Sequence, residues 1–146
     1  MKNILNTDYK WIQIAILMIY YLDVPNMSKQ KLVELLYLIY KKLKKTIPLR
    51  DLNFYFNMKT KEIEITNSTK DIKIEDILNE LISEEFLDEF NGEIYCTYFG
   101  EKLLKLIMDD PEYEYQINNI IKVIVQYEDL SEKGLMDLIL KDLKHN

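Results

Sequence analysis

The stretch of residues 74–107 constrains the fold most, because it predicts a helix, a tight hairpin and a second helix in immediate succession. Asn91-Gly92 stands between two short segments that favour strands. This pair is preferred in type I′ hairpin turns, since both central residues of such a turn need a positive φ. Thr97 is expected to cap the second helix, over residues 98–108.

The same stretch resembles the recognition helix and wing of winged-helix (winged helix-turn-helix) proteins. The resemblance rests on the leucine-rich segment 77–87, Gly92, Tyr95-Cys96-Thr97 and the segment 100–104. Many proteins of this kind have a glycine at the step from the helix into the wing, where this chain has Glu85. We therefore expect the turn into the wing to be made differently. The resemblance implies an α+β, mainly α fold, with a winged-helix core, two short β-hairpins and two C-terminal helices.

The first half of the chain predicts two helices and a hairpin. Residues 9–22 are apolar on nearly every face, which predicts a central helix capped by Thr7 or Asp8. Ser28 is expected to cap the next helix, which continues to about residue 45. The alternating segments 52–58 and 62–66 predict the first hairpin. The polar segment 67–71 predicts a plain connector.

Residues 28–38 are similar to the opening helix of the Panacea (SocA-like) antitoxin domains. Both contain the motif lysine-leucine-x-x-leucine-leucine-tyrosine, which runs here from Lys31 to Tyr37. The resemblance implies a role as an antitoxin. The glycine-proline step that follows the motif in that family does not occur in this chain, so no binding residue is transferred from it.

Two more helices are predicted after the wing. Asp110 is expected to cap the first, with Pro111 in its first turn, and Ser131 to start the second. The whole chain, 1–146, is expected to form one domain, with a core over about residues 8–108 and a helical extension over about 110–144. The apolar stripes of the extension either form a homodimer interface or pack on the first helix.

The charge balance disfavours nucleic acids and anionic membranes as partners. The chain has 25 acidic and 19 basic residues, a net charge of −6, so its averaged field repels phosphate groups. Arg50 is its one arginine, although the arginine guanidinium is the group best suited to bidentate binding of guanine or phosphate. DNA binding would therefore need a local cluster of lysines.

The single cysteine and the single histidine limit the possible chemistry. Cys96 cannot form an internal disulfide, and with His145 alone it cannot complete a structural zinc site, so a cytoplasmic location is expected. The apolar run of residues 11–22 is too short to cross a bilayer, and no cleavage site follows it. No phosphate-binding glycine loop or cysteine–histidine pair is found. We therefore expect no enzyme activity, cofactor or metal.

The outward positions of the predicted helix after residue 73 distinguish two hypotheses. These positions are Glu75, Asp76, Asn79, Glu80, Ser83 and Glu84. Four of the six are carboxylates, which the phosphates of a DNA groove would repel. The first hypothesis is therefore a non-enzymatic regulator that binds a protein partner through this acidic face, with imitation of nucleic acid as one possible mode.

The second hypothesis is a winged-helix transcription regulator or antitoxin that binds DNA through lysines. The candidates lie at the end of the second helix and in the first hairpin, and they are Lys41, Lys42, Lys44, Lys45, Lys59 and Lys61. The simpler interpretation of the helical lysines is that cations stabilise a helix C-terminus and stay solvated. DNA binding requires that these lysines lie on one side of the molecule.

Overall fold

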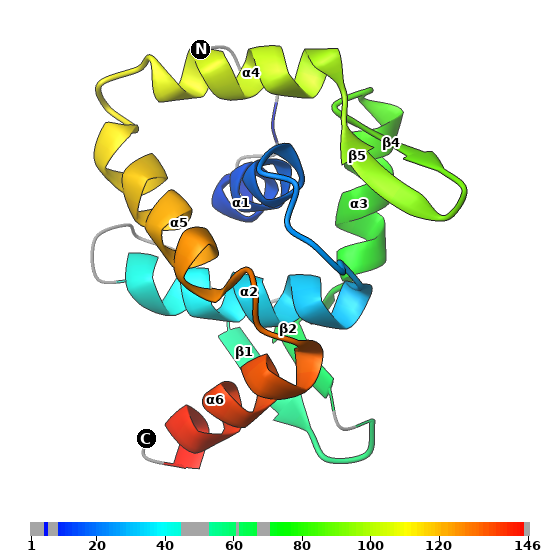
Figure 1. Ribbon diagram of the computed structural model, residues 1–146, viewed down its shortest axis with the longest axis vertical. Coiled ribbons are helices and arrows are strands. Elements are labelled where there is room, and N and C mark those ends of the chain that lie inside the picture. Colours follow the sequence, from blue (N-terminus) through cyan, green and yellow to red (C-terminus); the bar gives the residue numbers. More distant parts are fainter. Residues whose placement is uncertain (1–4, 6–8, 45–52, 61, 67–70, 145–146) are drawn as a thin grey trace.

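The computed structural model describes residues 5, 9–44, 53–60, 62–66 and 71–144 (Figure 1). Within these ranges the chain forms six helices and five short strands, which confirms the expected α+β, mainly α class. The helices are α1 (Lys10–Tyr21), α2 (Lys29–Leu43), α3 (Ile74–Ser83), α4 (Tyr98–Met108), α5 (Glu114–Tyr127) and α6 (Glu132–Lys144). The strands are β1 (Asn53–Asn57), β2 (Glu62–Thr66), β3 (Asp71–Ile72), β4 (Leu87–Phe90) and β5 (Glu93–Cys96).

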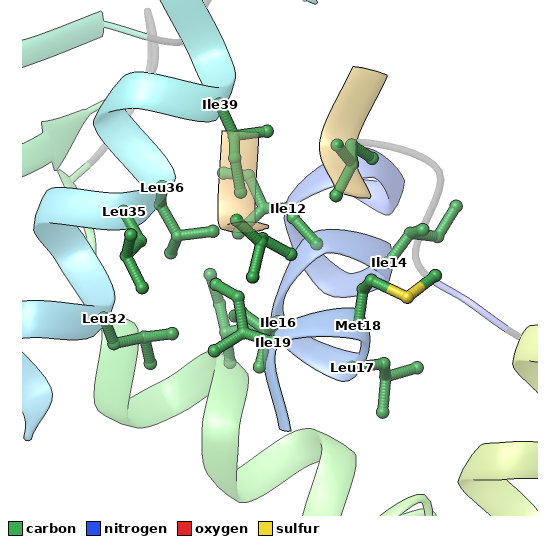
Figure 2. Close-up of a cluster of buried hydrophobic side chains, with 14 of the residues drawn as sticks. Ile12, Ile14, Ile16, Leu17, Met18, Ile19, Leu32, Leu35, Leu36 and Ile39 are labelled. Atoms are coloured by element: carbon green, nitrogen blue, oxygen red, sulfur yellow. The ribbon is translucent and has the colours of Figure 1, made fainter. Parts of the chain in front are cut away.

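Helix α1 lies at the centre of the fold, with α2, α4, α5 and β5 packed around it (Figure 1). Its fully buried side chains point to opposite sides of the helix, with Ile16 and Ile19 toward α2 and Ile14 and Met18 away from it (Figure 2). A central apolar helix was expected, and this expectation is confirmed. No helix within the described ranges is long and apolar enough to cross a membrane.

The ends of α1 and α2 follow the expected capping in part. The N-cap of α1 is Tyr9, while the expected caps Thr7 and Asp8 lie outside the described residues. Ser28 caps α2 as expected, because its side-chain oxygen accepts a hydrogen bond from the backbone N–H of Lys31 at 3.0 Å. This cap fixes the point at which the chain leaves the α1–α2 loop and enters α2.

Strands β1 and β2 form the first predicted hairpin, with Phe54 opposite Ile65 and Phe56 opposite Ile63. Strand β3 adds to the other edge of β2, where Asp71 pairs with Thr66. The prediction of a plain connector over residues 67–71 is therefore wrong at its last residue, and residues 67–70 lie outside the described residues. A two-residue strand of this kind depends on the edge that it joins and has no local periodicity of its own.

The second hairpin matches its prediction. Strands β4 and β5 are antiparallel, and Asn91 (φ 52°) and Gly92 (φ 79°) form the turn with the two positive φ angles of type I′. Thr97 caps α4 by accepting a hydrogen bond from the backbone N–H of Gly100 at 3.1 Å. A Cβ atom at Gly100 would lie 2.2 Å from the carbonyl oxygen of Phe86, so only glycine allows this close approach.

The step from α3 into the hairpin corrects one expectation. Glu85 itself adopts the left-handed conformation, with φ 66°, although it has a side chain. The backbone N–H of Phe86 donates to the carbonyl of Leu81 at 3.0 Å, and that of Glu85 to the carbonyl of Ile82 at 2.9 Å. These two bonds define a Schellman motif, which ends many helices. The expectation of a differently made turn is wrong, because glutamate occupies the position and conformation that glycine favours.

Helices α5 and α6 pack mainly against α2, and α5 also contacts α1. Leu135 and Ile139 of α6 are fully buried within the same hydrophobic cluster as α1.

Asp110 accepts a hydrogen bond from the N–H of Glu112 and so caps the turn before α5, whereas the N-cap of α5 is Tyr113. The prediction of Asp110 as the helix cap is therefore wrong, because a separate turn precedes the helix.

A buried lysine connects α2 to the end of α5. The Lys31 side chain is 2% exposed, and its Nζ donates hydrogen bonds to the carbonyl oxygens of Pro25 at 2.8 Å and Glu128 at 2.7 Å. Glu128 is the C-cap of α5, where the helix dipole favours a cation. Burial is the main cause of the lowered pKa of Lys31. One amine therefore joins the α1–α2 loop, α2 and α5.

Glu34 lies one turn further along α2 and is fully buried. Its Oε2 accepts a hydrogen bond from Gln30 at 3.1 Å, while its Oε1 has no hydrogen-bond partner in the described part of the chain. Burial raises the pKa of Glu34 to about 7, and the negative charge of Glu132 acts in the same direction. This carboxyl is therefore protonated in the folded protein at mildly acidic pH.

The left-handed Glu85 predicts the effect of a single substitution. We expect Glu85→Gly to raise the free energy of unfolding by about 1 kcal/mol, since glycine removes the steric cost of a positive φ. Glu84→Gly is the matched control, because Glu84 has φ −81° and gains nothing from glycine. Urea denaturation of both variants tests this prediction. A Glu85→Gly protein no more stable than the Glu84→Gly protein would contradict it.

The buried Glu34 predicts how stability changes with pH. The folded state keeps this proton up to about pH 7, whereas the unfolded carboxyl releases it near its ordinary value of 4.5. The stabilisation is therefore complete below pH 4.5 and is lost progressively as the pH rises from 4.5 to 7, by about 3 kcal/mol.

We expect Glu34→Gln, which stays neutral, to remove most of this loss between pH 5 and 8. Urea denaturation across that range measures it, and Glu84→Gln, at an exposed position, is the control. An unchanged pH dependence in Glu34→Gln would show that another group is responsible.

Candidate protein-binding groove

Three segments that are distant in sequence enclose a groove of about 690 Å³. Its walls are the α1–α2 loop, one flank of α3 and the β4–β5 hairpin, whose arrangement is shown in Figure 1. We call it the acidic groove. It is lined by Tyr20, Asp23, Val24, Pro25, Asn26, Met27, Ser28, Lys29, Glu75, Leu78, Asn79, Ile82, Glu89, Gly92, Glu93 and Ile94.

Two tight turns fix the walls of the acidic groove. In the α1–α2 loop, Asp23 (φ 58°) and Asn26 (φ 56°) adopt left-handed conformations, which aspartate and asparagine tolerate better than most residues. The opposite wall ends in the Asn91-Gly92 turn. The residue types at these turns therefore match the backbone conformations that shape both walls.

The groove has an apolar floor and a mostly acidic rim. Leu78 is buried and Ile82, Ile94 and Met27 are half-buried, so apolar surface remains accessible at the bottom. The carboxylates that line it are Asp23, Glu75, Glu89 and Glu93, whereas its one cation is Lys29. Four negative charges minus one positive charge give the lining a net charge of −3.

Lys29 and Glu75 form an ion pair at one end of the groove, with side chains that are 58% and 50% exposed. The hydrogen bond from Lys29 is the largest cause of the lowered pKa of Glu75. Both residues also line a neighbouring hollow of about 770 Å³ between α2, β2 and the start of α3. The pair therefore separates two concave regions of one face.

The six outward residues predicted for α3 have different surroundings. Glu75 and Asn79 line the acidic groove, whereas Asp76, Ser83 and Glu84 are exposed outside it. Glu80 is half-buried and accepts a hydrogen bond from the hydroxyl of Tyr9 at 2.5 Å, so it connects α3 to the start of α1.

Sequence reasoning missed Asp23, Glu89 and Glu93, which complete the rim. The Asn-Gly turn was a signal for the position of Glu89 and Glu93, since it fixes which residues stand beside it. Nothing local marks Asp23, because only the tertiary fold brings the α1–α2 loop to α3.

The candidate DNA-binding lysines do not form one cluster among the described residues. Lys41 pairs with Asp142 of α6, and Lys42 is exposed nearby. Both line a hollow of about 480 Å³ between α2, α5 and α6, which we call the basic hollow. Its lining residues are Leu38, Lys41, Lys42, Lys122, Val123, Gln126, Tyr127, Leu138 and Asp142.

Two of the other candidate lysines lie away from the basic hollow, and two lie outside the residues that the structure describes. Lys44 is exposed at the C-cap of α2, and Lys59 is exposed in the β1–β2 turn. Lys45 and Lys61 lie outside the described residues. The basic hollow also contains Lys122 of α5, which the sequence analysis did not select as a candidate.

Cys96 lacks the properties of a nucleophile. Burial raises the pKa of its thiol to about 11, and the charge of Glu101 adds to this shift, so the thiol stays protonated at neutral pH. Among the described residues, no group of three or more histidine, cysteine or acidic side chains is arranged to hold a metal ion.

Comparisons of the chain with models of known protein families, with curated proteins and with solved structures found no match.

The Lys29–Glu75 pair predicts a measurable change in titration. We expect Lys29→Met to raise the pKa of Glu75 toward its ordinary value, because it removes the hydrogen bond and the nearest cation. Lys73→Met is the control, since Lys73 is the weakest of the causes that lower this pKa. NMR titration of the side-chain carboxyl carbon of Glu75 measures both variants. Equal shifts in the two variants would contradict the assignment of the pair.

Proposed function

We propose that the protein is a non-enzymatic regulator whose acidic groove binds a basic segment of a protein partner. The observation that carries the proposal is the net charge of −3 around an apolar floor, along the flank of α3 that includes Glu75 and Asn79. A lysine- or arginine-containing segment complements this charge, and its apolar side chains can cover the floor.

The shape of the groove favours binding of an extended peptide segment over binding of the flat surface of a folded partner. Its carboxylates come from three walls, so a partner must insert between them to reach several at once. An extended chain can do this, because alternate side chains point to opposite sides and reach both the rim and the floor. Imitation of nucleic acid would instead use the carboxylates outside the groove, such as Asp76 and Glu84.

A DNA-binding regulator or antitoxin is the alternative function, and the charges support it less. In the winged-helix resemblance α3 would enter the major groove, where Glu75, Asp76 and Glu84 would meet phosphate repulsion. Lys41 is already paired with Asp142. Binding would therefore depend on exposed lysines such as Lys42 and Lys59, which lie on different elements.

Binding of short peptides tests the proposal. Fluorescence anisotropy would compare a labelled octapeptide of alternating lysine and leucine, its glutamate–leucine counterpart and a short DNA duplex, at about 50 mM salt. We expect binding of the basic peptide alone. The double variant Asp23→Asn/Glu89→Gln should weaken it about two- to thirtyfold, because the two exposed charge pairs that it removes each contribute about 0.2–1 kcal/mol.

The control variant is Glu112→Gln/Asp137→Asn, which removes the same charge from exposed positions outside the groove. It should bind the basic peptide nearly as well as the native chain does. An equal loss in both variants would show that only the overall charge matters. Tight binding of the DNA duplex would favour the alternative function.

A further inference from the structure

The basic hollow concentrates positive charge in a chain whose net charge is −6. Its lining includes Lys41, Lys42 and Lys122 against one carboxylate, that of Asp142. Asp142 is already engaged, because it pairs with Lys41 and accepts a hydrogen bond from the hydroxyl of Tyr37 at 2.8 Å. Lys42 and Lys122 have no ion pair within the described residues, so their charges remain available.

Apolar surface accompanies these lysines. Leu138 of α6 is 40% exposed and lines the hollow beside Val123 and Tyr127. A concave site with accessible apolar atoms and two available cations fits an occupant that has both aromatic rings and carboxylates.

The outer face of the β4–β5 hairpin has these two properties. Alternation along the strands places Ile94 and Cys96 on the inner side and Asp88, Phe90, Glu93 and Tyr95 on the outer side. Phe90 is 68% exposed and Tyr95 is 46% exposed. The Tyr95 hydroxyl donates a hydrogen bond to Asp88 at 3.0 Å, which holds that ring in place.

We propose that the outer face of the β4–β5 hairpin of one molecule binds the basic hollow of a second copy of the chain. The hairpin face carries two negative charges, from Asp88 and Glu93, and the hollow has three lysines and one aspartate, a net charge of +2. Opposite charges orient the two surfaces, while Phe90 and Leu138 provide apolar contact. Exposed aromatic residues that are grouped on one face are typical of interaction sites.

The two surfaces lie on different sides of the molecule. The hairpin projects on one side of the fold, while α5 and α6 lie on the other side and below α2 (Figure 1). One molecule therefore offers both surfaces, and each pairs with a different neighbour. Such a head-to-tail contact produces a closed ring or an open chain of molecules. The two proposals share one residue, Glu93, which lines the acidic groove and also lies on the outer face of the hairpin. Phe90, Tyr95 and Asp88 do not line the groove, so the hairpin face can be tested without changing it.

Two variants remove one surface each. Phe90→Ser/Tyr95→Ser disables the hairpin face and leaves the acidic groove unchanged, and Lys42→Glu/Lys122→Glu disables the hollow. The charge control for the second variant is Lys102→Glu/Lys133→Glu, which changes two exposed lysines outside the hollow. Circular dichroism confirms that each variant is folded, and sedimentation equilibrium at 10–500 µM protein and about 50 mM salt measures mass.

We expect the native chain and the control to self-associate, and each surface variant to associate at least about tenfold more weakly. A mixture of the two surface variants should form a 1:1 heterodimer and nothing larger, since only one productive pair of surfaces remains. A monomeric native chain would overturn the proposal. Self-association that survives in either surface variant, or a mixture that stays monomeric, would overturn it as well.

Discussion

The enclosure of α1 is the constraint on which the rest of the structure depends. A helix that is apolar on nearly every side cannot lie on a surface, and burial of each Leu or Ile side chain contributes about 1.5–3 kcal/mol. Several other elements must therefore surround it, and α2, α4, α5 and β5 do so. The acidic groove follows from this arrangement, because the loop that leaves α1 is brought beside α3 and the hairpin.

Polar groups inside the fold restrict how the helices pack around α1. Lys31 of α2 donates to the carbonyl of Pro25 in the α1–α2 loop and to the carbonyl of Glu128 at the end of α5, which an apolar side chain of similar size could not do. Glu34 is buried beside the same contact, with one oxygen unpartnered within the described residues. Because their hydrogen bonds need specific partners, these groups favour one arrangement of α2 and α5. Their burial also costs desolvation free energy, and this cost depends on pH because burial shifts the pKa of both groups.

Local interactions were the part of the fold that the sequence could predict. The Asn91-Gly92 turn and the caps by Ser28 and Thr97 depend on neighbouring residues, and all three are confirmed. Strand β3 depends on an edge formed by distant residues and was not predicted. Glu85 was misjudged because the chain tolerates a strained φ that sequence reasoning assigns to glycine.

Of the candidate site, only the residues contributed by α3 could be predicted from the sequence. Spacing alone placed Glu75 and Asn79 on the outer side of α3, and both line the groove. Asp23 joins them only through the tertiary fold. Glu80 was expected to point outward, but Tyr9 at the start of α1 binds it, which no pattern within α3 could reveal.

The most direct test of the acidic groove as a protein-binding site is zero-length cross-linking. A carbodiimide joins carboxylates to lysine amines in direct contact, and peptide mapping by mass spectrometry identifies the carboxylates that react with a lysine–leucine peptide. The account predicts cross-links concentrated at Asp23, Glu75, Glu89 and Glu93. Cross-links spread evenly over all exposed carboxylates, including Glu112 and Asp137, would contradict it.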